Sequence, residues 1–234
     1  MAKRNILTTT RNFMSYKDIL SGPEILPESA KHLVVLLHGY GSNGDDLISL
    51  AEEWCGDMPD TAFIAPNAFE PLPMMFANAY QWFDLSQRDP QHYIQGMEQA
   101  IPKAQAYLDA VLQAFALEDK NLSLVGFSQG AMMAISLGLN RQNDIAGVLG
   151  YSGKYIHPES LPVNARPEML LIHGDHDDVV PFDSLHEAKA ALQQHNVKVT
   201  TEACQGLGHS IDAKGLALGR EFLNNNRNLH NTGE

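Results

Sequence analysis

The sequence predicts an α/β protein in which a doubly wound, mostly parallel β-sheet is flanked by helices. Short apolar segments alternate along the chain with longer segments of helical periodicity, which is the order that builds such a sheet. Most of the short segments are apolar at nearly every position, as strands covered on both faces must be. No internal repeat and no low-complexity linker divides the 234 residues, so we expect a single domain over residues 1–234.

Six short apolar segments are predicted as strands, because they combine β-branched residues with lengths typical of buried strands. In chain order they are HLVVLLHG (residues 32–39), TAFIAP (61–66), NLSLVG (121–126), IAGVLGYSG (145–153), EMLLIHG (168–174) and VKVTTEAC (197–204). The segment FMSYK (residues 13–17) is a further candidate, as an antiparallel strand at the edge of the sheet.

Five segments are predicted as helices. They cover residues 45–55, 91–117, 129–140, 184–195 and 212–226. In the second of them, apolar residues recur at helical spacing, and Pro102 predicts a kink or a restart. Asp45 or Asp46 is the expected N-cap of the first helix, because a carboxylate there accepts hydrogen bonds from free backbone N–H groups.

Composition excludes several classes of partner. The formal net charge of −12 argues against nucleic acid and against anionic membrane surfaces, since both require a basic face. No apolar run approaches the length of a membrane span, and the N-terminus lacks the apolar region of a secretory signal, so we expect no stable membrane insertion. The two cysteines are too few for a disulfide framework, which favours a cytoplasmic protein. About ten N-terminal and about eight C-terminal residues are expected to be loosely held.

The segment LSLVGFSQGAM (residues 122–132) places Ser128 where an apolar strand gives way to a helix. G-x-S-x-G at such a junction indicates a strained turn that exposes the serine hydroxyl above a sheet. Gly126 and Gly130 flank the serine because a side chain at either position would collide with the neighbouring strand or helix. The pattern predicts a nucleophile at Ser128, and the alternative is a serine that caps the helix.

A serine nucleophile needs a general base and a group that orients the base. The segment GLGHS follows the last predicted strand and places His209 in a glycine-flanked loop, which favours it as the base. The acid is expected after the preceding strand, where Asp175, Asp177 and Asp178 are nearly equivalent on the sequence alone. Surface positions are expected for three other histidines, His186, His195 and His230.

Acyl transfer develops an oxyanion, which backbone N–H groups beside the serine and after an early strand stabilise. Gln129 directly follows Ser128, and Tyr40 follows the first predicted strand. The N–H groups of Tyr40 and Gln129 are therefore the expected oxyanion donors.

Together these segments resemble the α/β-hydrolases of the carboxylesterase, lysophospholipase and acyl-protein thioesterase group. The resemblance covers nearly the whole chain and rests on LLHGYGSNGDDL, APNA, WFD, GFSQGAMMA, HGDHDDVVP and GLGHS. It implies a catalytic triad of Ser128, Asp177 and His209, and the choice of Asp177 among the three acids rests mainly on it. It also agrees with the two oxyanion donors and makes a homodimer a candidate assembly. The triad mechanism itself requires no metal or organic cofactor.

Two other motifs compete with this interpretation. GYGSNG (residues 39–44) matches the G-x-G-x-x-G of a dinucleotide-binding turn, but the second predicted strand ends in FIAPNA, without the acid that would hold a ribose. HGDHDD offers a run of metal-ligand side chains, but metal sites need ligands that converge in space, usually from several loops, so we expect no metal. His173 is expected to pack at a strand end and His176 to lie in a turn.

The loop FEPLPMMFANAY (residues 69–80) is interpreted as a wall of the substrate pocket, with Met74, Met75, Phe76 and the following Trp82 as binding residues. Thioether side chains adapt to flexible acyl chains. Core packing or a dimer patch is the alternative. The link between residues 153 and 168 is too short for a cap domain, so we expect an open site that selects short to medium acyl chains.

The expected function is hydrolysis of a small-molecule carboxylic ester through an acyl-enzyme at Ser128. An acyl-protein or acyl thioesterase, or a lysophospholipase, is the alternative on the same site. A non-catalytic ligand-binding module is the alternative from another class, because a fold does not fix a function. The sequence retains every residue of the triad, which favours the enzyme.

Overall fold

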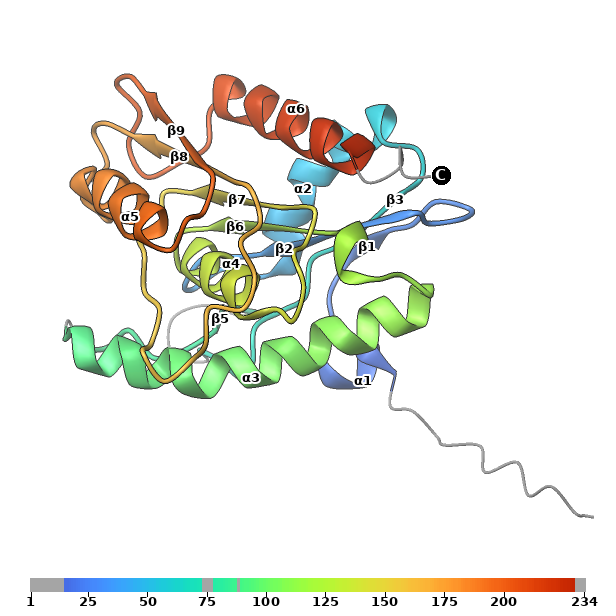
Figure 1. Cartoon of the computed structure of the whole chain (residues 1–234), viewed down its shortest axis with the longest axis horizontal. Coiled ribbons are helices and arrows are strands. Elements are labelled where there is room, and N and C mark those ends of the chain that lie inside the picture. Colours follow the sequence, from blue (N-terminus) through green and yellow to red (C-terminus); the bar gives the residue numbers. More distant parts are fainter. Residues whose placement is uncertain (1–14, 73–77, 88, 230–234) are drawn as a thin grey trace, which may run out of the picture.

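The computed structural model describes residues 15–72, 78–87 and 89–229. A seven-stranded sheet lies at its centre, with the strands in the order β1-β3-β2-β6-β7-β8-β9 (Figure 1). Strand β1 pairs antiparallel with β3, and every other neighbouring pair is parallel. The strands are β1 (Glu24–Ile25), β2 (His32–Leu37), β3 (Thr61–Ile64), β6 (Leu122–Phe127), β7 (Gly147–Tyr151), β8 (Met169–Gly174) and β9 (Val199–Cys204).

Helices cover both faces of this sheet (Figure 1). One hydrophobic cluster joins the sheet to α1, α3, α4 and α5, and a second joins its other face to α2 and α6. Strands covered on both sides must be apolar at nearly every position, which is the pattern of the sequence. The helices are α1 (Tyr16–Ile19), α2 (Gly44–Trp54), α3 (Pro90–Phe115), α4 (Gln129–Asn140), α5 (Asp183–Gln194) and α6 (Ala213–Leu229).

The doubly wound, mostly parallel architecture predicted from the sequence is confirmed. All six predicted strands and all five predicted helices are present, with ends shifted by a few residues. The edge strand predicted at residues 13–17 is wrong: Ser15 caps α1 in a reciprocal pair with Asp18, and the antiparallel edge strand is β1. The first ten residues, expected to be loosely held, lie outside the described residues; of the last eight, residues 227–229 continue α6 and the others lie outside as well.

Two details of the helices also differ from expectation. Asn43, and not Asp45 or Asp46, is the N-cap of α2, because its extended backbone lets the Asn43 side chain accept a hydrogen bond from the N–H of Asp46 (3.0 Å). Of the kink or restart expected at Pro102, the restart is wrong, because helix α3 is continuous from Pro90 to Phe115. Buried residues on both sides of Pro102 pack against α4 and the sheet, and this packing holds the helix across the missing hydrogen bond.

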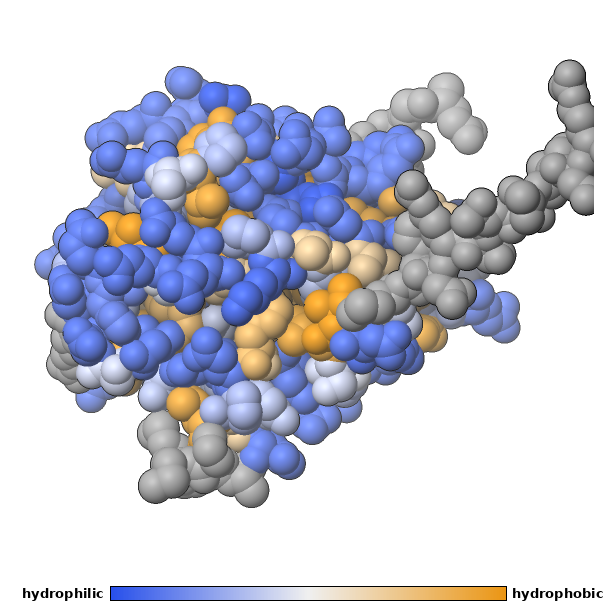
Figure 2. Space-filling view, turned by 90° about the horizontal axis from the view of Figure 1, so that it is seen from below, coloured by the Kyte–Doolittle hydropathy of each residue, from blue (hydrophilic) through white to orange (hydrophobic). Residues whose placement is uncertain are grey.

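The link after β7 contains no helix or strand between residues 153 and 168. It lies along α3 and α4, where His157 Nδ1 bonds to Ser136 Oγ (2.8 Å) and Pro162 O accepts a bond from Asn140 Nδ2 (3.1 Å). The link therefore forms no cap domain. Seen from the side of α3, the surface is mostly hydrophilic, with smaller hydrophobic areas between the polar side chains (Figure 2).

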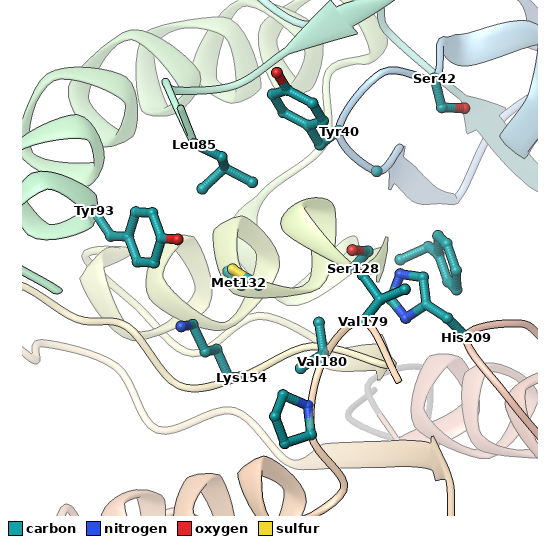
Figure 3. Close-up of a pocket in the computed structure, with 13 residues that line it drawn as sticks. Tyr40, Ser42, Leu85, Tyr93, Ser128, Met132, Lys154, Val179, Val180 and His209 are labelled. Atoms are coloured by element: carbon teal, nitrogen blue, oxygen red, sulfur yellow. The ribbon is translucent and has the colours of Figure 1, made fainter. Parts of the chain in front are cut away.

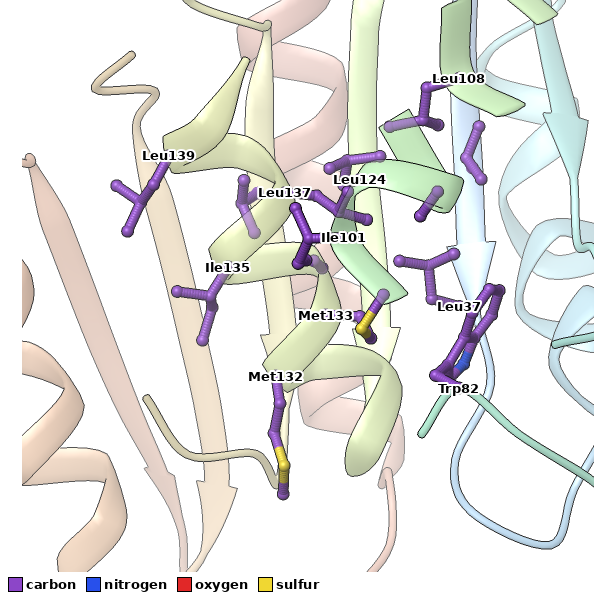
Figure 4. Packing of buried hydrophobic residues seen from close by; sticks show 14 of the residues in the cluster. Leu37, Trp82, Ile101, Leu108, Leu124, Met132, Met133, Ile135, Leu137 and Leu139 are labelled. Carbon is purple, nitrogen blue, oxygen red and sulfur yellow. The ribbon is translucent and has the colours of Figure 1, made fainter. Parts of the chain in front are cut away.

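Helix α4 anchors the centre of the molecule. Every residue from Gln129 to Leu139 is buried, and the apolar side chains of α4 pack between the sheet and α3 (Figure 4). Each large apolar side chain buried in this way stabilises the fold by about 1.5–3 kcal/mol. A helix held so firmly fixes the position of the residue at its N-terminus, which is Ser128.

Candidate active site

Ser128 lies between β6 and α4 in a backbone conformation that L-residues rarely adopt, with φ 54° and ψ −116°. Its N–H donates to Tyr151 O (2.9 Å), and its hydroxyl makes no capping bond to α4, which argues against the helix-cap alternative. A Cβ at Gly126 would lie 2.2 Å from Gly130 O, and one at Gly130 would lie 1.8 Å from Leu37 O. The turn thus requires both glycines, and it holds the serine in a strained, outward position.

His209 lies in the loop after β9 and contacts Asp177, which lies in the turn after β8. Its Nδ1 is 2.8 Å from Asp177 Oδ2. A carboxylate only accepts hydrogen bonds, so Nδ1 carries the proton and Nε2 of a neutral ring is free to act as a base. The N–H of His176 donates to Leu207 O (3.0 Å), which ties the loop of the histidine to that of the acid.

Among the three acids that the sequence left nearly equivalent, only Asp177 contacts His209. Asp175 accepts a hydrogen bond from Gly206 N (2.6 Å), and Asp178 is exposed. The other carboxylate oxygen of Asp177 accepts bonds from Val179 N (2.9 Å) and Val180 N (2.8 Å). Burial raises the pKa of Asp177, but these bonds and the one from His209 outweigh that effect and hold the pKa below its ordinary value.

A second histidine also contacts the acid. His173 at the end of β8 is buried, and its Nε2 lies 3.2 Å from Asp177 Oδ2 and 2.9 Å from Val180 O. Both neighbours are acceptors, so Nε2 carries the proton and donates to them. Sequence reasoning placed His173 at a packed strand end, as the structure does, but did not connect it with the acid.

A cavity of about 350 Å³ opens beside Ser128 and His209, which lie next to each other at one end of it (Figure 3). The aromatic ring of Phe127 backs the imidazole of His209, with 4.8 Å between ring centroids. Apart from Ser128 and His209, the described residues that line the cavity are Gly39, Tyr40, Ser42, Leu85, Tyr93, Phe127, Met132, Lys154, Val179, Val180 and Pro181.

The two residues expected to donate to the oxyanion lie at this cavity or beside it. Tyr40 lines the cavity, and Gln129 is the first residue of α4, where N–H groups have no partner within the helix. The buried Gln129 side chain accepts a bond from Trp82 N (3.0 Å) and donates to Phe83 O. Trp82 Nε1 in turn donates to His38 O (2.9 Å), so Trp82 connects the two sides of the expected oxyanion hole.

Trp82 therefore does not occupy the place expected for a binding residue. It is 2 % exposed and is absent from the described lining of the cavity, because its indole packs between His38 and Phe69. Met74, Met75 and Phe76 lie outside the described residues. The wall that the structure shows, with Leu85, Tyr93, Met132 and Lys154, was missed because these residues come from separate segments with no local pattern.

The buried ring of His38 supports the strand end before Tyr40. Its Nε2 accepts a bond from Ala68 N (2.9 Å), so its Nδ1 carries the proton that bonds to Gly39 O (2.8 Å). Burial lowers the pKa of His38, which keeps the ring neutral. His38 is therefore a structural group and not a second base.

The competing motifs have structural explanations. The N–H of Gly44 donates to Asn67 Oδ1 (2.9 Å), and a Cβ there would lie 2.0 Å from Ala65 O, so the glycine-rich turn packs against the segment that follows β3 and presents no open phosphate cradle. Within the described residues, no group of three or more His, Cys, Asp or Glu side chains could hold a metal ion.

A family model described as phospholipase/carboxylesterase matches residues 24–227, which is most of the chain. The chain belongs to the phospholipase/carboxylesterase family. This membership confirms the resemblance seen in the sequence and makes the protein an α/β-type hydrolase. In the part of the chain that the structure describes, no helix is both long and apolar enough to cross a membrane.

Named relatives of this family member include esterases and thioesterases. Acyl-protein thioesterase 1 of Emericella nidulans is 29% identical over 225 residues, which cover 86% of this chain and 93% of the relative. Esterase YpfH of Escherichia coli is 26% identical over 207 residues, which cover 83% of this chain and 82% of the relative. The crystal structure of esterase PE8 matches with a TM-score of 0.83 at 39% identity, covering 88% of this chain and 98% of that one.

Proposed function

We propose that the protein hydrolyses carboxylic esters of short to medium acyl chains through an acyl-enzyme at Ser128. The observation that carries the proposal is the meeting of a strained, outward serine with a histidine–aspartate pair at one end of a cavity. Family membership supports the reaction class, and the relatives named esterases agree with it.

The chemistry proceeds in two steps. His209 Nε2 takes the proton of Ser128 as the serine Oγ bonds to the acyl carbon, and the N–H groups of Tyr40 and Gln129 stabilise the resulting oxyanion. The oxyanion collapses, the bond to the alcohol breaks, and His209 gives its proton to the leaving alcohol. Water, deprotonated by His209, then attacks the acyl carbon; the bond from that carbon to Ser128 Oγ breaks, and His209 returns the proton to Oγ, which frees the serine and releases the acid. Asp177 stays ionised throughout, which its lowered pKa favours, and stabilises the imidazolium.

The size of the cavity supports the preference for short to medium acyl chains. A volume of about 350 Å³ lies near the lower end of the range for ligand pockets. Each methylene contributes about 0.8 kcal/mol only while it stays covered, so carbons that extend beyond the cavity add little affinity.

Acyl esters from acetyl to palmitoyl test the proposal, with 4-nitrophenol as a common leaving group. We expect kcat/KM to peak at short or medium chains and to vanish in Ser128→Ala. A steady rise up to palmitoyl would contradict the chain-length preference, and activity retained in Ser128→Ala would contradict the nucleophile.

Thioester hydrolysis at the same site is the second candidate, because relatives named acyl-protein thioesterase cover most of the chain. A thioester uses the same triad and oxyanion donors and differs only in the leaving group. Matched acyl esters and acyl thioesters with equal acyl chains decide between the two through the ratio of their kcat/KM values.

We also propose a single domain that acts in the cytoplasm. One sheet contains strands from residue 24 to residue 204, and Cys55 and Cys204 are both free thiols. The homodimer stays a prediction.

A further inference from the structure

Among the described residues that line the cavity beside Ser128, Lys154 is a cation in a wall that is otherwise apolar or uncharged. Lys154 is the only lysine or arginine among the described lining residues, and no described aspartate or glutamate lines the cavity. The chain as a whole has 28 acidic and 16 basic residues. A cation in the substrate cavity of so acidic a protein calls for a specific explanation.

Lys154 is held in place by an aromatic ring. It follows the turn after β7 and is half-buried, and its Nζ lies 4.7 Å from the ring centroid of Tyr93 on α3, a cation–π distance. It forms no ion pair with any described carboxylate. Burial lowers the pKa of Lys154, and the charge of Glu187, an exposed residue on α5, opposes that shift. The ammonium thus has an aromatic support but no ion-pair partner among the described residues.

The position of Lys154 identifies the part of the substrate that it would meet. His209 must protonate the leaving group, so the leaving group lies on the His209 side of Ser128. Met132 lies between Ser128 and Lys154, on the opposite side from His209 (Figure 3). An acyl chain that extends away from the histidine therefore passes along Met132 and ends near Lys154.

We propose that Lys154, supported by Tyr93, is a subsite for a carboxylate at the far end of the acyl chain. The preferred substrates are then half-esters or half-thioesters of dicarboxylic acids, which water cleaves to the dicarboxylate and the alcohol or thiol. A neutral alkyl chain would cover the ammonium without supplying a counter-charge, which costs free energy, whereas a carboxylate pairs with it. The proposal rests on the hydrolase function proposed above and specifies its substrate class.

Two esters with acyl chains of equal length test the subsite: ethyl hexanoate, which is neutral, and monoethyl adipate, whose chain ends in a carboxylate. The readout is the ratio of kcat/KM for the anionic ester to that for the neutral ester. We expect Lys154→Met to lower this ratio by about five- to tenfold. High salt should lower the wild-type ratio and leave that of Lys154→Met unchanged.

Lys103 offers a matched control. Its Nζ lies 5.7 Å from the ring centroid of Phe69, outside the described lining of the cavity, so Lys103→Met removes the same charge from a similar lysine–aromatic contact. We expect Lys103→Met to keep the wild-type ratio. Lys154→Glu provides a gain-of-function arm, because it should favour the ethyl ester of ω-aminohexanoic acid over ethyl hexanoate. Lys154→Gln serves in place of Lys154→Met if the latter does not fold.

The outcomes separate the two proposals. Equal ratios in the wild type and in Lys154→Met, with both esters cleaved, would overturn the subsite and leave the hydrolase function intact; the ammonium would then point into water and only its aliphatic stem would line the cavity. If Lys103→Met lowered the ratio as much as Lys154→Met does, the drop would reflect the loss of one positive charge and not the position of Lys154. That result would also overturn the subsite. Cleavage of neither ester by the folded wild type would contradict the hydrolase function itself.

Discussion

Substitution of Gly130 by alanine tests whether the close packing of the turn at Ser128 creates the active site. The added Cβ would lie 1.8 Å from Leu37 O and 2.7 Å from His38 O, both of them backbone atoms at the end of β2. Side chains can rotate away from such contacts, but a central strand cannot, so α4 must move. Overpacking of this kind costs about 1–3 kcal/mol and occasionally more. For Gly130→Ala we expect the free energy of unfolding to fall by about 3 kcal/mol, because the added Cβ meets two backbone groups.

Two other glycines calibrate this value. Gly138 lies in the same helix, but there the added Cβ would meet the side chain of Val148 (2.7 Å), which can shift. The helical preference for alanine, about 1 kcal/mol, offsets part of that cost. Gly56 has no atom within 4 Å of an added Cβ, so Gly56→Ala should stay within about 0.5 kcal/mol of the wild type.

Urea unfolding measures the stabilities, and ester hydrolysis of the folded variants measures the effect on the site. We expect the order Gly56→Ala, Gly138→Ala, Gly130→Ala for increasing destabilisation, with a loss of kcat/KM only in Gly130→Ala. A Gly130→Ala variant as stable and active as Gly138→Ala would refute the claim that contact between α4 and β2 fixes the serine.

The remaining predictions concern the groups around His209. Asp177→Asn should lower kcat by about 10⁴-fold, because Asp177 orients His209. Asp175→Asn should retain activity, because Asp175 accepts a bond from Gly206 N and does not contact His209. The reverse result in steady-state kinetics would show that Asp175 is the acid. His173→Leu removes a hydrogen-bond donor to Asp177, so it should lower kcat about tenfold and move the acid limb of the pH–rate profile to higher pH. His173→Gln, which keeps a donor, should recover part of the activity. An unchanged profile in His173→Leu would show that His173 contributes only packing. The pKa of Asp177 is lower in the folded protein than its ordinary 3.8, so its ionised form stabilises the fold above pH 3.8, and this stabilisation is lost as the pH falls through the folded value. Across that pH range, the free energy of unfolding measured in urea should depend less on pH in Asp177→Asn than in the wild type. The same pH dependence in both proteins would contradict the lowered pKa of Asp177.

The fold could be predicted from the sequence because its signals are local. Each parallel strand is a continuous apolar run, and GFSQG encodes a turn whose backbone requires glycines on both sides of the serine. The carboxyl ends of parallel strands lie at one edge of a sheet, so the sequence predicts that Ser128, His209 and one of the acids after the preceding strand meet there; the choice of Asp177 among those acids rests on the family resemblance.

Other features depend on contacts between distant segments and could not be predicted. Asp177 differs from Asp175 only through the turn that directs two N–H groups and His209 to its carboxylate. Trp82 follows a loop and resembles a pocket residue, but hydrogen bonds to His38 and Gln129 draw it into the core. Similarly, the edge strand expected near residue 13 gave way to α1, because Ser15 and Asp18 form a capping pair.

Covalent labelling of the native protein with a fluorophosphonate tests the central claim most directly, because the reagent reports an activated serine and needs no knowledge of the substrate. Intact-mass and peptide mass spectrometry should find one adduct, on Ser128, formed much more slowly in His209→Ala and absent in Ser128→Ala. Ser128→Ala should remain folded by urea unfolding, so the loss of label reports the nucleophile alone. An adduct on another residue, or none on Ser128 in the folded wild-type protein, would contradict the assignment of Ser128 as the nucleophile.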